Sequence, residues 1–120
     1  MNNIEDLVNK IIEGLEDSKA KSIVKIDLRK IENCFCSFFV ICHGTSGTHI
    51  AALAEAVEDK VKEDLHEDPF HVEGEDNSRW TVLDYGDVVV HIFDKELRDY
   101  YQLEDFWGDG ISEEIPDTED

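Results

Sequence analysis

The first candidate for chemistry is a glycine-rich turn, His43-Gly44-Thr45-Ser46-Gly47, which lies between an apolar run and a helical pattern. Such a turn at a helix N-terminus points backbone N–H groups at an anion, as phosphate-binding sites do. Enzymes that transfer nucleotidyl groups follow a turn of this kind with a strand whose alternate carboxylates hold Mg2+. Here the residues after the turn have helical spacing and supply no such pair. We interpret the turn as a helix cap, and the alternative is a nucleotide-binding enzyme of nucleotidyltransferase ancestry.

Three further groups of reactive residues favour structural roles. Asp84 and Asp87 bracket the Tyr85-Gly86 turn, where acidic side chains more often bond the backbone or face water than form a catalytic pair. His91 lies within an apolar strand and is predicted to be a hydrogen-bonded core histidine. Cys34, Cys36 and Cys42 do not have the C-x2-4-C spacing of zinc sites, which favours free buried thiols. The sequence therefore predicts a protein that is not an enzyme and has no metal site and no cofactor.

Aromatic residues indicate binding instead. Trp80, Tyr85, Tyr101 and Trp107 could form an adhesive surface, because Trp and Tyr bury much area with little loss of entropy. Tyr85 stands between two aspartates at a turn, so we expect it to be exposed. Trp107 is explained equally well by packing that closes the core.

Charge restricts the class of partner. The chain has 120 residues with 30 acidic against 11 basic, a net charge of −19. Nucleic acids are bound through Lys and Arg, so direct binding to RNA or DNA is not expected. A basic protein would be attracted by the opposite charge. No apolar run is long enough to span a bilayer, and Met1-Asn2-Asn3-Ile4-Glu5-Asp6 is not a targeting signal, so we expect a cytoplasmic protein without a membrane partner.

Hydrophobic periodicity predicts the elements that must position these residues. Helices are indicated at residues 4–15, 46–65 and 95–103, the last with Asp94 as N-cap. Strands are indicated at residues 22–28, 38–42, 70–73, 79–83 and 88–93. This order predicts the α/β class, a mixed five-stranded sheet with flanking helices. Residues 1–110 form a single domain, and residues 111–120 form an acidic tail that is expected to be disordered.

The run W-x-V-L-D-Y-G-D-V-V-V-H-I-F followed by L-R-D-Y-Y-x-L-E-x-F-W-G-D resembles the signature of the ribosomal silencing factor (RsfS, or Iojap) family. The resemblance extends upstream through Phe39-Val40-Ile41-Cys42-His43-Gly44-Thr45-Ser46 and through Val72-Glu73-Gly74. One departure is Ser37-Phe38, where many members have Asp-Tyr.

The resemblance implies a nucleotidyltransferase-like fold and a binding function. Members bind a basic protein of the large ribosomal subunit, ribosomal protein fourteen, and sterically block joining of the small subunit, which represses translation under nutrient limitation. Some members self-associate, so a homodimer is an open alternative. The positions that would contact the partner are Trp80, Asp84, Tyr85, Asp87, Tyr101 and Leu103.

Overall fold

A computed structural model describes residues 3–31, 36–74, 79–102 and 110–117. Helices and strands are interspersed along these residues, as expected for the α/β class. The helices are α1 (Ile4–Asp17), α2 (Gly47–Leu65) and α3 (Lys95–Tyr101). The strands are β1 (Lys21–Asp27), β2 (Phe38–Gly44), β3 (His71–Glu73), β4 (Trp80–Asp84), β5 (Val88–Asp94) and β6 (Ile111–Ile115).

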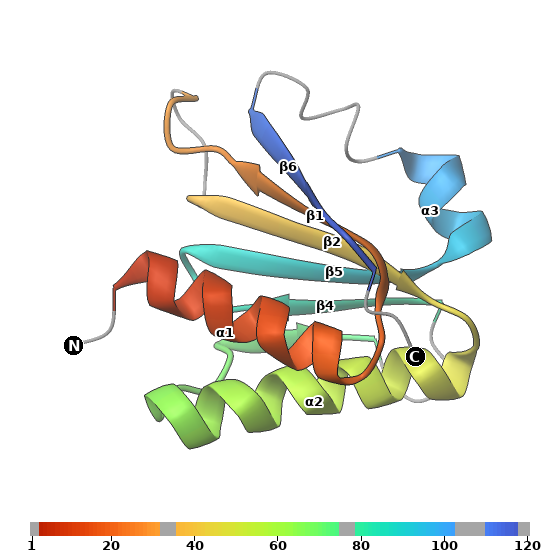
Figure 1. Cartoon of the computed structure of the whole chain (residues 1–120), viewed down its shortest axis with the longest axis horizontal. Coiled ribbons are helices and arrows are strands. Elements are labelled where there is room, and N and C mark those ends of the chain that lie inside the picture. The colour runs from red at the N-terminus through yellow and green to blue at the C-terminus, as the bar shows by residue number, and fades with distance from the viewer. Residues whose placement is uncertain (1–2, 32–35, 75–78, 103–109, 118–120) are drawn as a thin grey trace.

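The strands form one sheet in the order β3-β4-β5-β2-β1-β6 across the described residues (Figure 1). β2 and β5 are parallel neighbours at its centre, and the other neighbouring strands pair antiparallel. A parallel pair needs a crossover connection, which α2 and the β3–β4 hairpin supply here. The predicted mixed α/β sheet is confirmed, with one strand more than expected.

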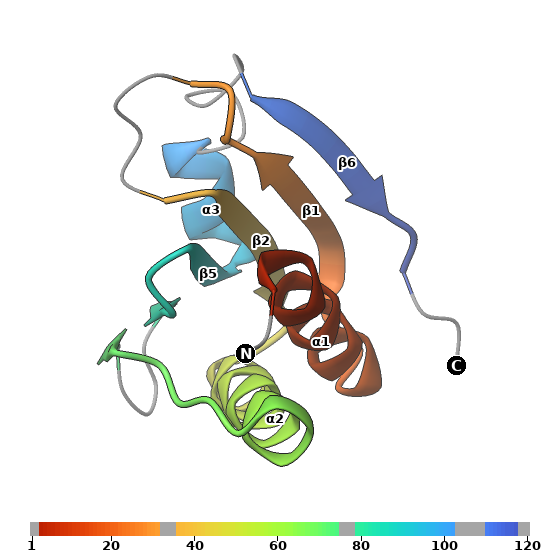
Figure 2. The same ribbon diagram turned by 90° about the vertical axis from the view of Figure 1, so that its left-hand side faces the viewer.

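The two faces of the sheet are covered unequally. The long helices α1 and α2 pack together on one face, and the short α3 lies on the other (Figure 2). The larger apolar core lies under α1 and α2, and a smaller one lies on the α3 side. Every residue from Val88 to Phe93 is buried, as expected for a continuously apolar strand at the centre of a sheet that is covered on both faces.

The helical stripes predicted from spacing face the core. In α1 the buried residues are Leu7, Val8, Ile11, Ile12, Gly14 and Leu15, and in α2 they are Ile50, Leu53, Val57 and Val61. The two helices approach closely at Gly14, where an added Cβ would lie 3.0 Å from the carbonyl oxygen of Ala56. The helix α2 ends at Leu65 and is capped by His66 in the left-handed conformation, so it stops before Pro69.

The expectation of a disordered tail over residues 111–120 is wrong for Ile111–Ile115, which form the edge strand β6 against β1. Side-chain contacts fasten this strand. The Asp117 carboxylate accepts a hydrogen bond from the Ser22 backbone N–H at 2.7 Å, and the Lys25 ammonium lies 3.6 Å from Glu113. An edge strand is stabilised by its neighbour's backbone, so it does not need the apolar alternation by which strands are found in sequence. Residues 118–120 lie outside the described part of the chain.

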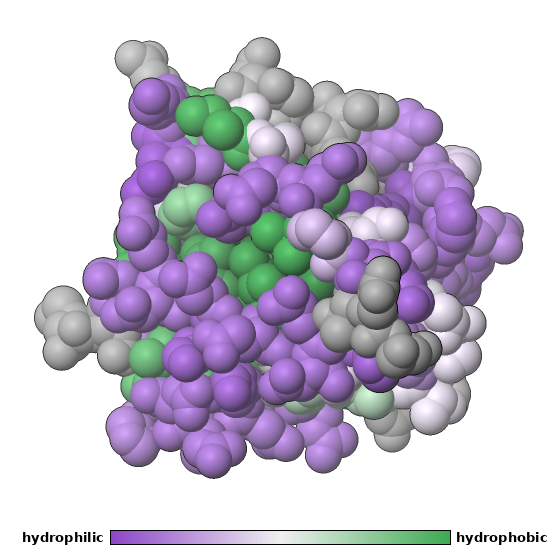
Figure 3. Space-filling view, in the orientation of Figure 1, coloured by the Kyte–Doolittle hydropathy of each residue, from purple (hydrophilic) through white to green (hydrophobic). Residues whose placement is uncertain are grey.

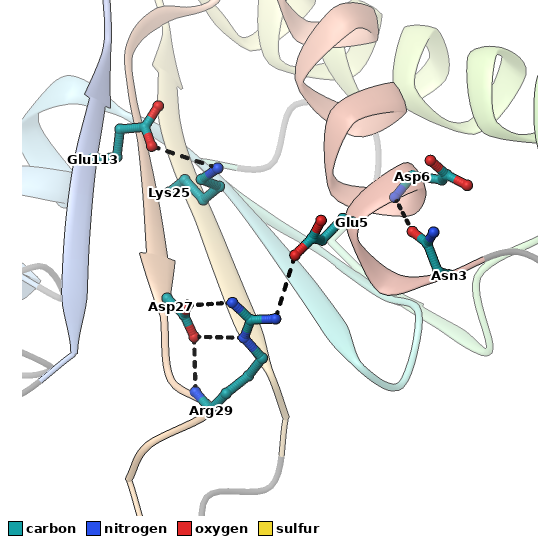
Figure 4. A network of polar contacts seen from close by, with 7 residues as sticks. All are labelled: Asn3, Glu5, Asp6, Lys25, Asp27, Arg29 and Glu113. Atoms are coloured by element: carbon teal, nitrogen blue, oxygen red, sulfur yellow. Dashed lines mark hydrogen bonds and ion pairs between the residues drawn. The ribbon is translucent and has the colours of Figure 1, made fainter.

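A polar network joins the end of β1 to the start of α1 (Figure 4). The Arg29 guanidinium donates to both carboxylate oxygens of Asp27 and lies 3.5 Å from Glu5. These hydrogen bonds from Arg29 lower the pKa of Asp27, and Asn3 caps α1 by accepting from the Asp6 N–H. The face of the molecule that is seen in Figure 1 is largely hydrophilic, with an apolar area near its middle (Figure 3). None of the described helices is long and apolar enough to cross a membrane.

Candidate partner-binding surface

The side chains of Ser46 and His49 accept hydrogen bonds from backbone N–H groups in and just after the glycine-rich turn. The Ser46 hydroxyl caps α2 by accepting from the His49 N–H at 3.0 Å. The His49 ring accepts from the Thr45 N–H through Nδ1 at 2.9 Å, and its Nε2 donates to the Ser18 carbonyl oxygen at 2.7 Å. A Cβ at Gly44 would lie 3.0 Å from the Ile50 side chain. The turn therefore ties α2 to the end of α1, in agreement with the predicted helix cap.

Replacing Ser46 by alanine is expected to lower the free energy of unfolding by about 1 kcal/mol, because one N–H of the first helical turn loses its acceptor. Urea unfolding followed by circular dichroism measures this loss. Ser46→Asp restores an acceptor and is the matched control. An unchanged stability in Ser46→Ala would contradict the assignment of Ser46 as a structural cap.

The remaining reactive residues also have structural contacts. Asp84 accepts a hydrogen bond from the Gly86 N–H at 2.8 Å, which is the backbone bonding predicted for an acidic turn residue. Cys42 is fully buried, and burial raises the pKa of its thiol to about 12, so it stays protonated and unreactive. Cys36 is also buried, and its thiol donates to the Phe38 carbonyl oxygen at 3.6 Å. Cys34 lies outside the described residues.

An aromatic surface lies on the face of the sheet away from α1 and α2. We define this aromatic face as the partly exposed rings of Trp80 and Tyr101 together with the buried rings of His91 and Phe93, which Trp80 contacts. The Trp80 ring stacks on Phe93 with centroids 4.9 Å apart and lies 5.1 Å from the Tyr101 ring. Trp80 is half-buried, whereas Tyr101 is 47% exposed. Fixed, partly exposed aromatic rings of this kind are common at the centres of protein interfaces.

Strand geometry explains how Trp80 reaches this position. Trp80 and Val82 alternate with the buried Thr81 and Leu83, so they share the face of their cross-strand partners Phe93 and His91. The Trp80 indole N–H donates to His91 Nδ1 at 3.2 Å.

The helix α3 is fixed at both ends, which sets the position of Tyr101. Asp94 accepts from the Leu97 N–H at 2.7 Å as the N-cap, and its other carboxylate oxygen accepts from Arg79, which lowers the pKa of Asp94. Arg98 is buried and donates to His43 Nδ1 at 3.0 Å. Burial, followed by the positive charge of Arg98, lowers the pKa of His43.

His91 is a core histidine, as predicted, but only one of its two ring nitrogens, Nδ1, has a hydrogen-bond partner among the described residues. An indole N–H can only donate, so Nδ1 of His91 must be the acceptor and the ring proton must lie on Nε2. That Nε2 is buried and has no hydrogen-bond partner among the described residues. Burial lowers the pKa of His91 from 6.5 to about 4, so the ring is neutral at pH 7.

This burial makes stability depend on pH. Between about 6.5 and about 4 the unfolded chain binds a proton at His91 that the folded protein does not, so the free energy of unfolding falls as the pH is lowered through this window. At about 1.4 kcal/mol per pKa unit, the full loss is about 3 kcal/mol.

His91→Phe keeps an aromatic ring at this position and removes the proton, so the variant should lose about 3 kcal/mol less than the wild type between pH 7 and pH 4. Urea titrations of both proteins at several pH values measure the difference. Parallel curves for the two proteins would show that His91 does not contribute.

The structure separates the predicted contact residues into two groups. Trp80 and Tyr101 lie together on the aromatic face, whereas Asp84 and the exposed Asp87 lie at the far end of β4. Four residues of strand place Trp80 and Asp84 about 13 Å apart. Leu103 and Trp107 lie outside the described residues.

The prediction that Tyr85 is exposed is wrong. Its side chain is only 4% exposed and belongs to the core under α1 and α2, and its hydroxyl has no hydrogen-bond partner among the described residues. Burial and the charges of Glu58, Asp68 and Glu67 raise the pKa of its phenol. Tyr85 therefore stabilises the turn from inside and is not a surface contact.

Two exposed aromatic residues were not singled out by the sequence analysis. Tyr100 is 79% exposed beside Tyr101, and Phe70 is 83% exposed just before β3. The Tyr100-Tyr101 pair was visible in the sequence, but helical spacing alone does not reveal which of two adjacent rings turns toward the sheet. The sequence did not indicate that Phe70 is exposed, because an apolar residue beside a short strand is usually buried.

The chain is similar in sequence and in fold to known proteins of one family. A family model described as "Ribosomal silencing factor during starvation" (RsfS) matches residues 1–120. A protein named ribosomal silencing factor RsfS from Halalkalibacterium halodurans is 35% identical over 111 residues, which cover 92% of this chain and 93% of the relative. The Bacillus subtilis protein of the same name is 39% identical over 94 residues, covering 78% of each chain. A crystal structure of a Chromobacterium violaceum protein is 34% identical, with a TM-score of 0.83 over 89% of this chain and 88% of that chain.

Proposed function

Because this chain belongs to the RsfS family of ribosomal silencing factors, we propose that it binds the large ribosomal subunit and sterically prevents the small subunit from joining. The protein acts in the cytoplasm as a binding protein without catalytic activity. Its direct partner is a basic protein of the large subunit, ribosomal protein fourteen, which the aromatic face contacts. The result is repression of translation when nutrients are limiting.

The observation that carries this proposal is the aromatic face, where Trp80 and Tyr101 are held in contact on the side of the sheet where α3 lies. Preformed rings lose little entropy on binding, which favours affinity. Asp84 and Asp87 lie at the other end of the same strand and turn, and they supply carboxylates toward a basic partner.

The net charge supports a protein partner rather than ribosomal RNA. A protein with a charge of −19 is repelled by phosphate backbones, whereas a basic ribosomal protein attracts it and speeds the encounter. A body measuring 36 × 33 × 28 Å is large enough to occupy the space that an opposing subunit would need. Steric obstruction of the small subunit, without any chemical step, would then produce the silencing.

Subunit joining in a purified system tests the proposal. Large subunits are incubated with the protein, small subunits are added, and sucrose-gradient sedimentation measures the fraction of joined ribosomes. The wild type should co-sediment with large subunits and reduce joining. Tyr101→Ala should do both less well, because its exposed ring belongs to the aromatic face.

Ile111→Ser on β6 is the matched control, because it removes an exposed apolar side chain (57% exposed) far from Trp80 in the sheet order. This variant should inhibit as the wild type does. Wild-type protein that binds no large subunits would overturn the proposed function. Binding that is lost equally in Tyr101→Ala and Ile111→Ser would overturn the assignment of the aromatic face.

A further inference from the structure

A second adhesive surface lies at the β3 end of the sheet. We define the β3 edge as Phe70 together with His71, Val72 and Glu73. Phe70 is 83% exposed and Val72 is 40% exposed, and all three residues of β3 are exposed. Val72 pairs with the buried Leu83, so Phe70 and Val72 lie on the side of α2, opposite to the aromatic face. The β3 edge is therefore a surface distinct from the aromatic face.

The exposed Phe70 is held in a fixed position. Its backbone N–H donates to the Asp84 carbonyl oxygen at 2.8 Å, which joins it to the end of β4. Gly86 has a φ of +87°, and a Cβ added there would lie only 2.9 Å from the Phe70 ring. The ring consequently lies against the glycine of the β4–β5 turn. An apolar ring held in this way binds a partner with little additional ordering.

The backbone of β3 is open to another strand. In the described part of the chain β3 is the last strand at this end of the sheet, and it pairs only with β4. Alternate N–H and C=O groups of an edge strand point away from the sheet and can pair with an added strand. The two sides of β3 differ in chemistry, because Phe70 and Val72 are apolar on one side, whereas the other side carries the Glu73 carboxylate and the His71 ring that is hydrogen-bonded to it.

Charge identifies the kind of partner. Glu67 and Asp68 come just before Phe70 and Glu73 ends β3. Glu58, Asp68 and Glu67 lie close enough to the β4–β5 turn to raise the pKa of Tyr85. A second copy of this chain would bring another charge of −19 to the same place, which disfavours self-association at this edge.

We propose that the β3 edge binds an extended basic segment of another protein, which joins the sheet as an additional strand. Apolar side chains of the segment pack on Phe70 and Val72, and alternate Lys or Arg side chains lie beside Glu73. A segment with alternating apolar and basic residues satisfies both sides at once, because side chains of neighbouring strands in register share a face.

A nine-residue peptide of alternating lysine and valine tests this proposal. Fluorescence anisotropy of the labelled peptide measures its affinity for the full chain, and amide hydrogen exchange locates the contact. The peptide should bind, slow the exchange of β3 amides, and bind more weakly as salt is raised. Phe70→Ser should weaken binding at least about fivefold, the effect of losing an interface residue worth about 1 kcal/mol.

Two controls separate strand addition from attraction by charge alone. Ile111→Ser on the opposite edge strand should leave the affinity unchanged. A peptide with the same composition but with its lysines and valines in two blocks should bind at least about fivefold more weakly, because it cannot match both sides of β3.

Any one of four results would overturn the proposal. These are no binding by the wild type, equal binding by Phe70→Ser and the wild type, equal binding of the alternating and block peptides, and protection of β6 instead of β3. The thermal unfolding midpoint of Phe70→Ser should match that of the wild type, because the ring is exposed. The test uses no ribosomes, so its outcome does not depend on the proposed function.

Discussion

Replacing Trp80 by alanine is expected to weaken binding to the large ribosomal subunit by about 2–4 kcal/mol, a loss of roughly 30- to 1,000-fold in affinity. The indole contacts Phe93, Tyr101 and His91 at once, so it is the centre of the aromatic face. Its removal takes away the largest ring of the surface and leaves Tyr101 without the ring it packs against. Quantitative co-sedimentation with purified large subunits measures the effect.

Loss of binding must be separated from loss of folding, because Trp80 is partly buried against the smaller core. The concentration of folded protein is therefore determined by urea unfolding of each variant before binding is measured. Trp80→Phe keeps a smaller ring on Phe93 and removes the indole N–H that donates to His91, so it should bind with intermediate affinity. Wild-type affinity in a fully folded Trp80→Ala sample would show that the aromatic face is not the ribosome contact.

Replacing Phe93 by alanine is expected to lower the free energy of unfolding by about 3–5 kcal/mol. Phe93 is fully buried in β5, and its ring supports Trp80 from below. The variant loses the transfer free energy of a whole aromatic side chain and leaves a cavity at the centre of the smaller core. Urea unfolding monitored by circular dichroism gives the change directly.

Phe93→Leu is the control for cavity size, because it fills most of the space and should lose markedly less stability than Phe93→Ala. The alanine variant should also bind ribosomes less well at equal concentrations of folded protein, since Trp80 would lose the ring on which it stacks. A stability loss below about 1 kcal/mol would show that the α3 side of the sheet is not a packed core.

Much of the fold was predictable because its signals are local. The helices α1 and α2 carry apolar residues at helical spacing, and the caps Ser46 and Asp94 are short-range features that the structure confirms. The two central strands are continuous apolar runs, which is the pattern of strands buried on both faces. The sequence pointed to Trp80 and Tyr101 as aromatic candidates for a binding surface, but it gave no indication that their two rings are in contact.

The predictions that were wrong concern the burial of a turn residue and the pairing of an edge strand. Tyr85 was predicted to face water because it lies in a turn between aspartates, yet the turn directs its ring into the core beneath α2. The residues Ile111–Ile115 were expected to be disordered, yet they pair with β1. In both cases a partner distant in the sequence decides the outcome, and local composition does not contain that information.

The sequence by itself determined the α/β class, the order of the main elements, the caps and the acidic character of the chain. These properties depend on periodicity and composition, which are written into consecutive residues. Only the tertiary structure decided which aromatic rings meet, that Tyr85 is buried and that Phe70 is exposed. Such features arise from strand register and from the coverage of each face, so residues from several elements must come together before a side chain is either buried or available to bind.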